Sequence, residues 1–300
     1  MIRAELSRRF RALLSGAESG VPEWTPLIAA GDDAGLFEPG DAPWVVHSDL
    51  ATMIGGVRAL LVQAMHPGSL AGVAQHSRYE EDVLGRLSGT IRWLTIMTYG
   101  PKSAITNEAG RVNGMHTKVR GTYNAPGEAE PRSYKASDPD LLMWVHIAFT
   151  DSFLAAHLAY GEKPIPGGAD LYVKQWGRAV LPLGVDSPPA SLAELESTID
   201  SYRDVITVNE RTLQIIKFLR KPPLPKGALP IYALLFAAAV GTLPEEWRKQ
   251  LGLRTLPNWF VRPVTRSLLW VMRLIVGDKS PLEDAALSRL ERIKQKGESA

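Results

Sequence analysis

The sequence predicts an all-α protein folded as a single multi-helix domain. Three observations support this prediction: apolar residues recur at helical spacing along most of the chain, no segment shows the alternation of a half-buried strand, and the connections are short. Prolines and glycines, 22 and 26 of 300 residues, mark most connections. We divide the domain into an N-terminal extension (1–44), a helical core (45–275) and a C-terminal helix (276–300).

The N-terminal extension is expected to hold one helix and one loop. Residues 3–14 have a basic amphipathic pattern without the continuous apolar stretch of a secretory signal. Residues 20–43 are rich in proline, glycine and aspartate, which predicts a loop.

The first core helix is expected at residues 50–65, where apolar residues recur at helical spacing and Ser48 can cap the start. Pro67 stands where a proline begins the next helix, which places His66 at a junction of two helices. Two further helices and a polar loop follow at residues 84–99, 104–119 and 122–137.

The most informative segment is 141–160, which is apolar nearly all round and therefore predicts a helix buried at the centre of the bundle. Ser137, Asp138 and Pro139 form a strong start signal, with a capping side chain followed by proline. The apolar stretch 229–243 is shorter than the ~20 residues that a spanning helix needs, so it predicts a core helix and no transmembrane segment. Further helices are expected at residues 166–182, 191–219, 228–241, 244–250, 257–276 and 281–297.

The composition excludes several kinds of site and partner. The chain has no cysteine, which rules out disulfides, zinc–thiolate sites, iron–sulfur clusters and cysteine-ligated or covalently attached haem. The net charge of +2 comes from basic residues spread along the chain, so the whole-chain charge gives no argument for nucleic acid or for anionic membranes. Because cysteine and a secretory signal are both missing from this sequence, we expect a cytoplasmic protein.

All histidines lie in the first 160 residues, which indicates a site in that half; the six are His47, His66, His76, His116, His146 and His157. His146 and His157 share one stripe of the apolar helix, because their spacing puts them only about 20° apart around its axis. His146 has Trp144 and Phe149 beside it, an apolar setting suited to a porphyrin face, and a neutral imidazole is a natural ligand of haem iron. The alternative, for His146 and above all for His157, is a core histidine with a local hydrogen-bond partner.

The helix expected at 104–119 carries further polar side chains. His116 and Arg120 are expected one turn apart on one face, and Arg111 lies on another. These residues fit a solvated basic face. They also fit a polar distal pocket whose donors stabilise dioxygen and pair with haem propionates.

Four motifs together resemble the MpaB/latex-clearing-protein family of b-type haem oxygenases. The first is GGVRALL at 55–61, which runs into QAMHP at 63–67 and AGVAQHS at 71–77. The other three are the segment 86–100, the segment from Arg111 through His116 to VRG at 119–121, and DPDLLMWVH at 138–146. The likeness covers residues 45–275, and the last motif is its most specific part.

The resemblance implies a helical bundle around haem b with packing distantly like that of globins. It also implies oxygen-dependent cleavage of carbon–carbon double bonds in prenyl-type chains. His146 stands where the family has its axial histidine, and Arg111 and His116 stand where distal residues would position dioxygen. The haem environment would be completed by side chains that pair with propionates or wall the pocket, namely His66, His76, Arg120, Trp93 and Phe149.

Two departures limit what the resemblance carries over. Rubber-cleaving members have adjacent lysine and threonine after their arginine, whereas this chain has His116-Thr117-Lys118, and their upstream catalytic glutamate has no counterpart around Thr95. Rubber cleavage is therefore not carried over. We expect a haem b oxygenase that acts with dioxygen on a small hydrophobic substrate such as an unsaturated isoprenoid or lipid. The alternatives are a haem sensor or carrier without turnover, and a helical binding module in which every histidine is structural.

Overall fold

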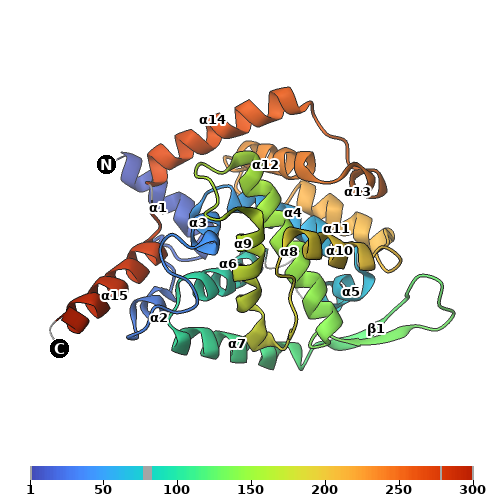
Figure 1. The fold of residues 1–300 in the computed structure, drawn as a ribbon. Helices are drawn as coiled ribbons and strands as arrows, with labels where there is room; N and C mark the ends of the chain where they lie inside the picture. Colours follow the sequence, from blue (N-terminus) through green and yellow to red (C-terminus); the bar gives the residue numbers. More distant parts are fainter. Residues whose placement is uncertain (1, 77–82, 278, 299–300) are drawn as a thin grey trace.

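The computed structural model describes residues 2–76, 83–277 and 279–298 and is mostly helical, with 67% helix and 3% strand. The prediction of an all-α protein is therefore confirmed (Figure 1). The described residues form these α-helices in chain order: α1 (Ile2–Ser15), α2 (Thr25–Ala29), α3 (Ala42–Ser48), α4 (Thr52–Gln63), α5 (Pro67–His76), α6 (Val83–Tyr99), α7 (Lys102–His116), α8 (Pro139–Tyr160), α9 (Gly168–Trp176), α10 (Leu192–Ser201), α11 (Glu210–Arg220), α12 (Leu229–Thr242), α13 (Glu245–Gln250), α14 (Asn258–Val276) and α15 (Pro281–Glu298).

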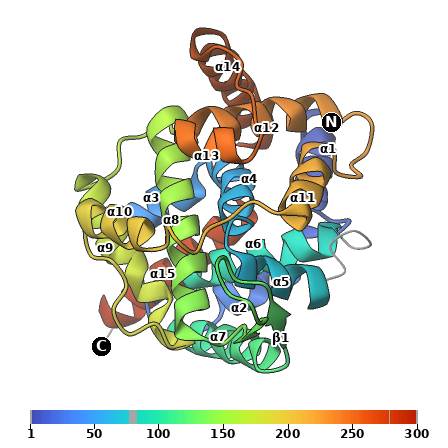
Figure 2. The same cartoon turned by 90° about the vertical axis from the view of Figure 1, so that its right-hand side faces the viewer.

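Helix α8 passes through the middle of the molecule in both views (Figures 1 and 2). Of its 22 residues 15 are buried, as its apolar pattern predicts, and it packs against α4, α9, α10, α12 and α14. It is long and apolar enough to cross a membrane, and 72% of its apolar window is buried inside the protein. Helices α3 and α4 pass the same test only as a pair, bent by 95°.

The closest helix pair, α4 with α8, is held by one glycine and one arginine. A Cβ atom on Gly55 would lie 2.6 Å from Cδ1 of Phe153 and 3.0 Å from its Cα, so only glycine allows this approach. One turn further along α4, Arg58 is 2% exposed and its Nη1 donates to Asp151 Oδ2 at 2.5 Å and to Ser152 Oγ at 2.8 Å. Both contacts fix α8 near its middle.

The predicted loop over 122–137 is partly wrong, because a β-hairpin begins two residues earlier and occupies much of it. Strand β1 (Arg120–Tyr123) pairs antiparallel with β2 (Arg132–Lys135), with Arg120 opposite Lys135. Tyr123 and Tyr134 pack with Ala71 of α5 and Leu141 of α8, which anchors the hairpin to the helical body. Strands of four residues are too short to show an alternating pattern in the sequence.

Two helix boundaries and one helix cap also differ from the predictions. Ser48 ends α3 rather than capping the next helix, and the Asp49 carboxylate accepts from the Ala51 amide instead, at 2.7 Å. Helix α8 begins at Pro139 as expected, but the Asp138 carboxylate accepts from the Lys135 amide of the hairpin. The single helix predicted at 191–219 is two helices, because Asn209 starts α11 with a capping box.

A segment of the N-terminal extension packs against the C-terminal helix. Helix α2, inside the predicted N-terminal loop, lies against α15 (Figure 1). Arg289 of α15 is fully buried and donates to the carbonyl oxygens of Ile28 and Ala34. The N-terminal extension and the C-terminal helix, which the sequence suggests are peripheral, are therefore in contact.

Candidate functional site

His146 lies on the buried part of α8 and is 3% exposed. Burial lowers the pKa of its imidazole to about 4, so the ring is neutral at pH 7. Neither ring nitrogen has a hydrogen-bond partner in the part of the chain that the structure describes. A buried polar group without a partner costs about 1–3 kcal/mol, so this position calls for a functional explanation.

The other buried histidines each have at least one partner. His47 Nδ1 lies 2.9 Å from Thr98 Oγ1 and its Nε2 lies 3.1 Å from the Tyr172 hydroxyl. His157 Nε2 lies 2.8 Å from the Lys163 carbonyl oxygen, which fits the structural alternative for this residue. Among the buried histidines, His146 alone lacks a partner on both nitrogens.

His66 has a structural role at the junction of α4 and α5. Its Nδ1 accepts from the amides of Gly68 at 3.1 Å and Ser69 at 3.3 Å, which caps the start of α5. The ring packs 5.7 Å from Trp144. Because Trp144 and His146 are about 200° apart around α8, His66 lies on the opposite side of that helix from His146.

His76 and Arg120 join the hairpin to α5. His76 is exposed, and its Nε2 lies 2.9 Å from the backbone carbonyl oxygen of Arg120. Helix α7 ends at His116 and Arg120 begins β1, so the prediction that His116 and Arg120 share one helix face is wrong. The chain turns out of the helix there because β1 pairs with β2.

Arg111 and His116 belong to a polar cluster between α6 and α7. Glu108 is 1% exposed and accepts from Arg92 Nε at 2.9 Å and from Arg111 Nη2 at 2.6 Å. Burial opposes ionisation of Glu108, but the hydrogen bonds from Arg111 and Arg92 outweigh it and lower its pKa. Half-buried His116 has a lowered pKa, through burial and then the charge of Arg111. Its Nδ1 is buried and has no partner among the described residues.

Trp93 lies on α6, next to Arg92, and packs on an apolar group that includes Leu142 of α8. Val180 and Val185 complete this group, and Met143 of α8 packs on it as well. Met143 lies one turn before His146 on the same side of α8. The Trp93 indole nitrogen is buried and lacks a partner within the described part of the chain. Phe149, 8% exposed, extends the apolar surface beyond His146.

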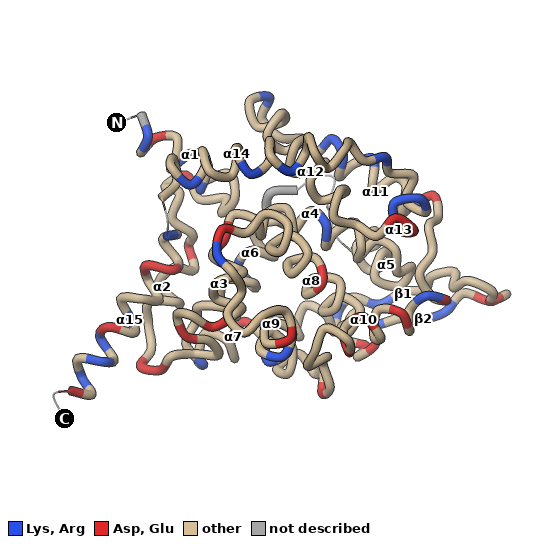
Figure 3. The backbone as a smooth tube through the Cα atoms, turned by 45° about the horizontal axis from the view of Figure 1, so that its top comes forward, with Lys and Arg blue, Asp and Glu red and all other residues tan. Residues whose placement is uncertain are grey.

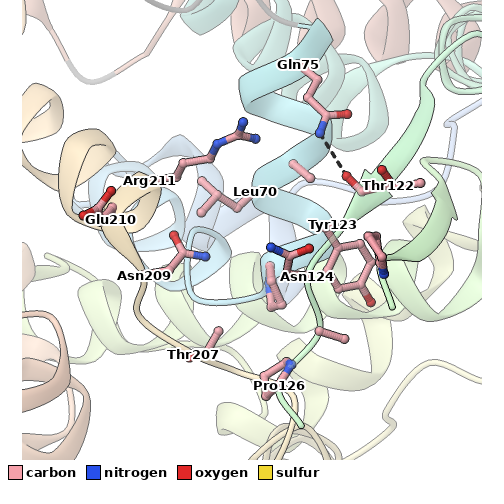
Figure 4. Close-up of a pocket in the computed structure, with 14 residues that line it drawn as sticks. Leu70, Gln75, Thr122, Tyr123, Asn124, Pro126, Thr207, Asn209, Glu210 and Arg211 are labelled. Atoms are coloured by element: carbon pink, nitrogen blue, oxygen red, sulfur yellow. Dashed lines mark hydrogen bonds between the residues drawn. The ribbon is translucent and has the colours of Figure 1, made fainter. Parts of the chain in front are cut away.

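A cavity of about 660 Å³ opens elsewhere, between α5, the hairpin and the start of α11 (Figure 4). Its polar lining includes Gln75, Asn124, Asn209 and Arg211, and Gln75 donates to the Thr122 carbonyl oxygen at 3.0 Å. None of the predicted site residues lines it. The described residues form no group of three or more His, Asp or Glu side chains able to hold a metal ion.

Fold and site together define a mostly helical protein whose central helix carries a buried histidine without a partner among the described residues. The chain belongs to the family described as "ER-bound oxygenase mpaB/B'/Rubber oxygenase, catalytic domain", whose model matches residues 44–276. This confirms the resemblance identified from the sequence and supports oxygenase chemistry in general. Comparisons with curated proteins and with solved structures gave no match.

Sequence reasoning missed Glu108 and Arg92. Glu108 precedes Arg111 by three residues, a spacing that places the two side chains together on a helix. The ion pair between them could therefore be predicted from the sequence. Arg92 lies on another helix, and its approach to Glu108 depends on how α6 packs on α7.

Neutralising Glu108 is expected to destabilise the protein by about 1–3 kcal/mol, because Glu108→Gln leaves two arginines facing each other without a counter-charge. Urea unfolding measures the loss. The control is Glu5→Gln, which removes a solvent-exposed pair with Arg8 and Arg9 and should change the midpoint little. Equal effects from both substitutions would contradict the role of the buried carboxylate.

Acidification is expected to destabilise the fold through its buried histidines. Burial lowers the pKa of His47 to about 3 and those of His66 and His146 to about 4, from 6.5. The unfolded chain binds these protons below pH 6.5 and the folded protein does not, so stability is complete above pH 6.5 and falls as the pH drops toward 4. At about pH 5 each histidine accounts for a loss of about 2 kcal/mol. Urea midpoints at neutral and acid pH measure the loss, and His146→Leu should reduce it; a pH-independent midpoint would refute this account.

Proposed function

We propose that this protein is a haem b-dependent oxygenase that acts with dioxygen on a small hydrophobic substrate, such as an unsaturated isoprenoid or lipid. Family membership supports the oxygenase part of the proposal. The observation that carries the haem part is His146, a neutral buried imidazole with both nitrogens unpartnered among the described residues. The proposed location is the cytoplasm.

A neutral, buried and unpartnered imidazole is a donor suited to haem iron, which supports the proposal. His146 would hold the iron through a ring nitrogen, and Phe149 and Trp93 would contribute apolar walls, in a bundle with distantly globin-like packing. When bound, haem supplies the iron at which dioxygen is activated. A single unpartnered histidine would suffice to hold it, because haem iron needs no cluster of protein ligands.

The chain's own residues would supply orientation, charge and water exclusion. Glu108 fixes the Arg111 guanidinium, so this cation is held in place before substrate arrives. His116 Nδ1, neutral at pH 7, is the atom able to accept or donate a proton. The apolar group around Trp93 and Met143 would exclude water from the same region. The proposal does not use His66, His76 or Arg120. His66 caps α5, and His76 is bonded to the backbone of Arg120 in the hairpin.

The test is oxygen consumption by haem-loaded protein with unsaturated isoprenoids and lipids, compared with saturated analogues. Consumption that requires the double bond and falls at least tenfold in Arg111→Met would support the proposal. Haem binding without consumption on any of these substrates would instead favour a sensor or carrier. Protein that stays colourless after haem addition would refute both.

A further inference from the structure

Helix α14 presents an apolar face to solvent. It lies across α1 and α12 on the outside of the molecule (Figures 1 and 2). Trp259 is 78% exposed and Trp270 is 59% exposed, although such side chains are normally buried. The other exposed apolar side chains of this helix are Phe260, Val264, Val271 and Leu274.

These side chains form one continuous stripe. At 100° per residue, the exposed apolar positions from Trp259 round to Val264 fill an arc of about 140°, interrupted only by Ser267. The side chains packed on the protein, Val261, Thr265 and Met272, occupy the opposite side. Helix α14 is therefore apolar on two sides. One side packs on the core of the protein, and the other faces solvent.

The exposed face does not result from loose docking of the helix. Arg266 Nη2 donates to the carbonyl oxygen of Ala159 at 2.9 Å. Arg273 is bound to Asp49 at 2.9 Å and to Glu162 at 3.3 Å. Two arginines therefore fix α14 to the end of α8, with its apolar stripe turned outward.

The segment that carries the stripe has an excess of basic residues, although Arg273 is paired with Asp49 and Glu162 and Lys249 with Glu245. Residues 247–277 contain six basic residues and no acidic one. Arg262 on α14 and Arg254 in the segment before it are exposed, and α14 carries blue but no red segments in Figure 3. The whole-chain charge of +2 hides this local excess.

We propose that α14 docks flat on an anionic lipid bilayer, with Trp259 and Trp270 at the boundary of the acyl chains and Arg254 and Arg262 among the headgroups. An apolar stripe rich in tryptophan, bordered by arginines, is the pattern of a helix that lies in the interface plane. The helix, about 28 Å long, would lie along the surface without crossing it. A second copy of the chain fits less well, because residues 247–277 offer no carboxylate to the arginines of a partner. This proposal does not depend on haem.

Vesicle sedimentation of the full chain tests the proposal, with vesicles of phosphatidylcholine alone and of phosphatidylcholine mixed with phosphatidylglycerol. We expect binding to the mixed vesicles that weakens with salt, with a blue shift of tryptophan emission. W259S/W270S should lower partitioning at least tenfold, and R254E/R262E should remove the preference for the anionic lipid. The matched control is Leu213→Ser, an exposed apolar position on α11.

Circular dichroism verifies that each variant is folded. Failure of the wild type to bind mixed vesicles, or binding unchanged in W259S/W270S, would overturn the proposal. So would a dimer in sedimentation velocity that W259S/W270S abolishes in the absence of vesicle binding, since α14 would then be a contact between copies.

Discussion

His146→Leu is expected to abolish retention of haem while leaving the helical fold intact. The imidazole is the group proposed to hold the haem iron, and leucine fills its volume without offering a lone pair. No described side chain loses a hydrogen bond in this substitution, because neither ring nitrogen has one. In haem-free protein the substitution should therefore raise the free energy of unfolding by about 1–3 kcal/mol, the cost of burying an unpartnered polar group. The absorption spectrum after addition of haem measures retention, and urea unfolding measures stability.

His47→Leu is the matched control, because His47 is also buried on an apolar surface but has two partners. Its loss leaves the buried Tyr172 hydroxyl without its partner, while Thr98 keeps its bond to the Leu94 carbonyl oxygen, and this should cost about 1–3 kcal/mol. The opposite signs of the two stability changes would distinguish a side chain kept for a ligand from one kept for the fold. A haem band that survives in His146→Leu would move the ligand elsewhere, with His116 the next candidate. Destabilisation by His146→Leu would return His146 to the structural alternative.

The features that sequence could predict are those set by local pattern. Helix α8 is apolar all round and starts at a proline, so both its existence and its burial follow from residues that are neighbours in the chain. The β-hairpin was missed because its strands are short and are held by Tyr123 and Tyr134 packing on α5 and α8. That packing is a tertiary contact and leaves no periodic signal.

The same distinction applies to the site. His146 was identified from its apolar surroundings on one helix, and the structure adds that its nitrogens are unpartnered among the described residues. His66 was placed at a helix junction by Pro67, but its role as the cap of α5 depends on where the ring points. In the sequence, Arg58 stands out only as part of the GGVRALL motif. Its bond to Asp151 joins residues 93 positions apart, and no spacing rule reaches that far.

Asp151→Leu is expected to destabilise the protein by about 3–5 kcal/mol, because it leaves the guanidinium of Arg58 buried without a counter-charge. Arg58 is 2% exposed, whereas the side chain of Asp151 is 24% exposed. Arg58→Met should therefore cost less than Asp151→Leu, since the carboxylate left behind can turn to water and the methionine keeps the packing of the arginine stem. Urea unfolding measures both.

The double variant distinguishes two roles of the ion pair. Either the pair stabilises the position of α8, or each charge only compensates the other. If Arg58 and Asp151 act mainly on each other, Arg58→Met with Asp151→Leu should recover most of the loss, because no buried charge remains. The control is Arg203→Met, which removes a solvent-exposed ion pair with Asp200 and should change the midpoint little. Losses that simply add in the double variant would mean that Arg58 and Asp151 contribute independently, and that the approach of α4 to α8 is fixed by Gly55 and Phe153 instead.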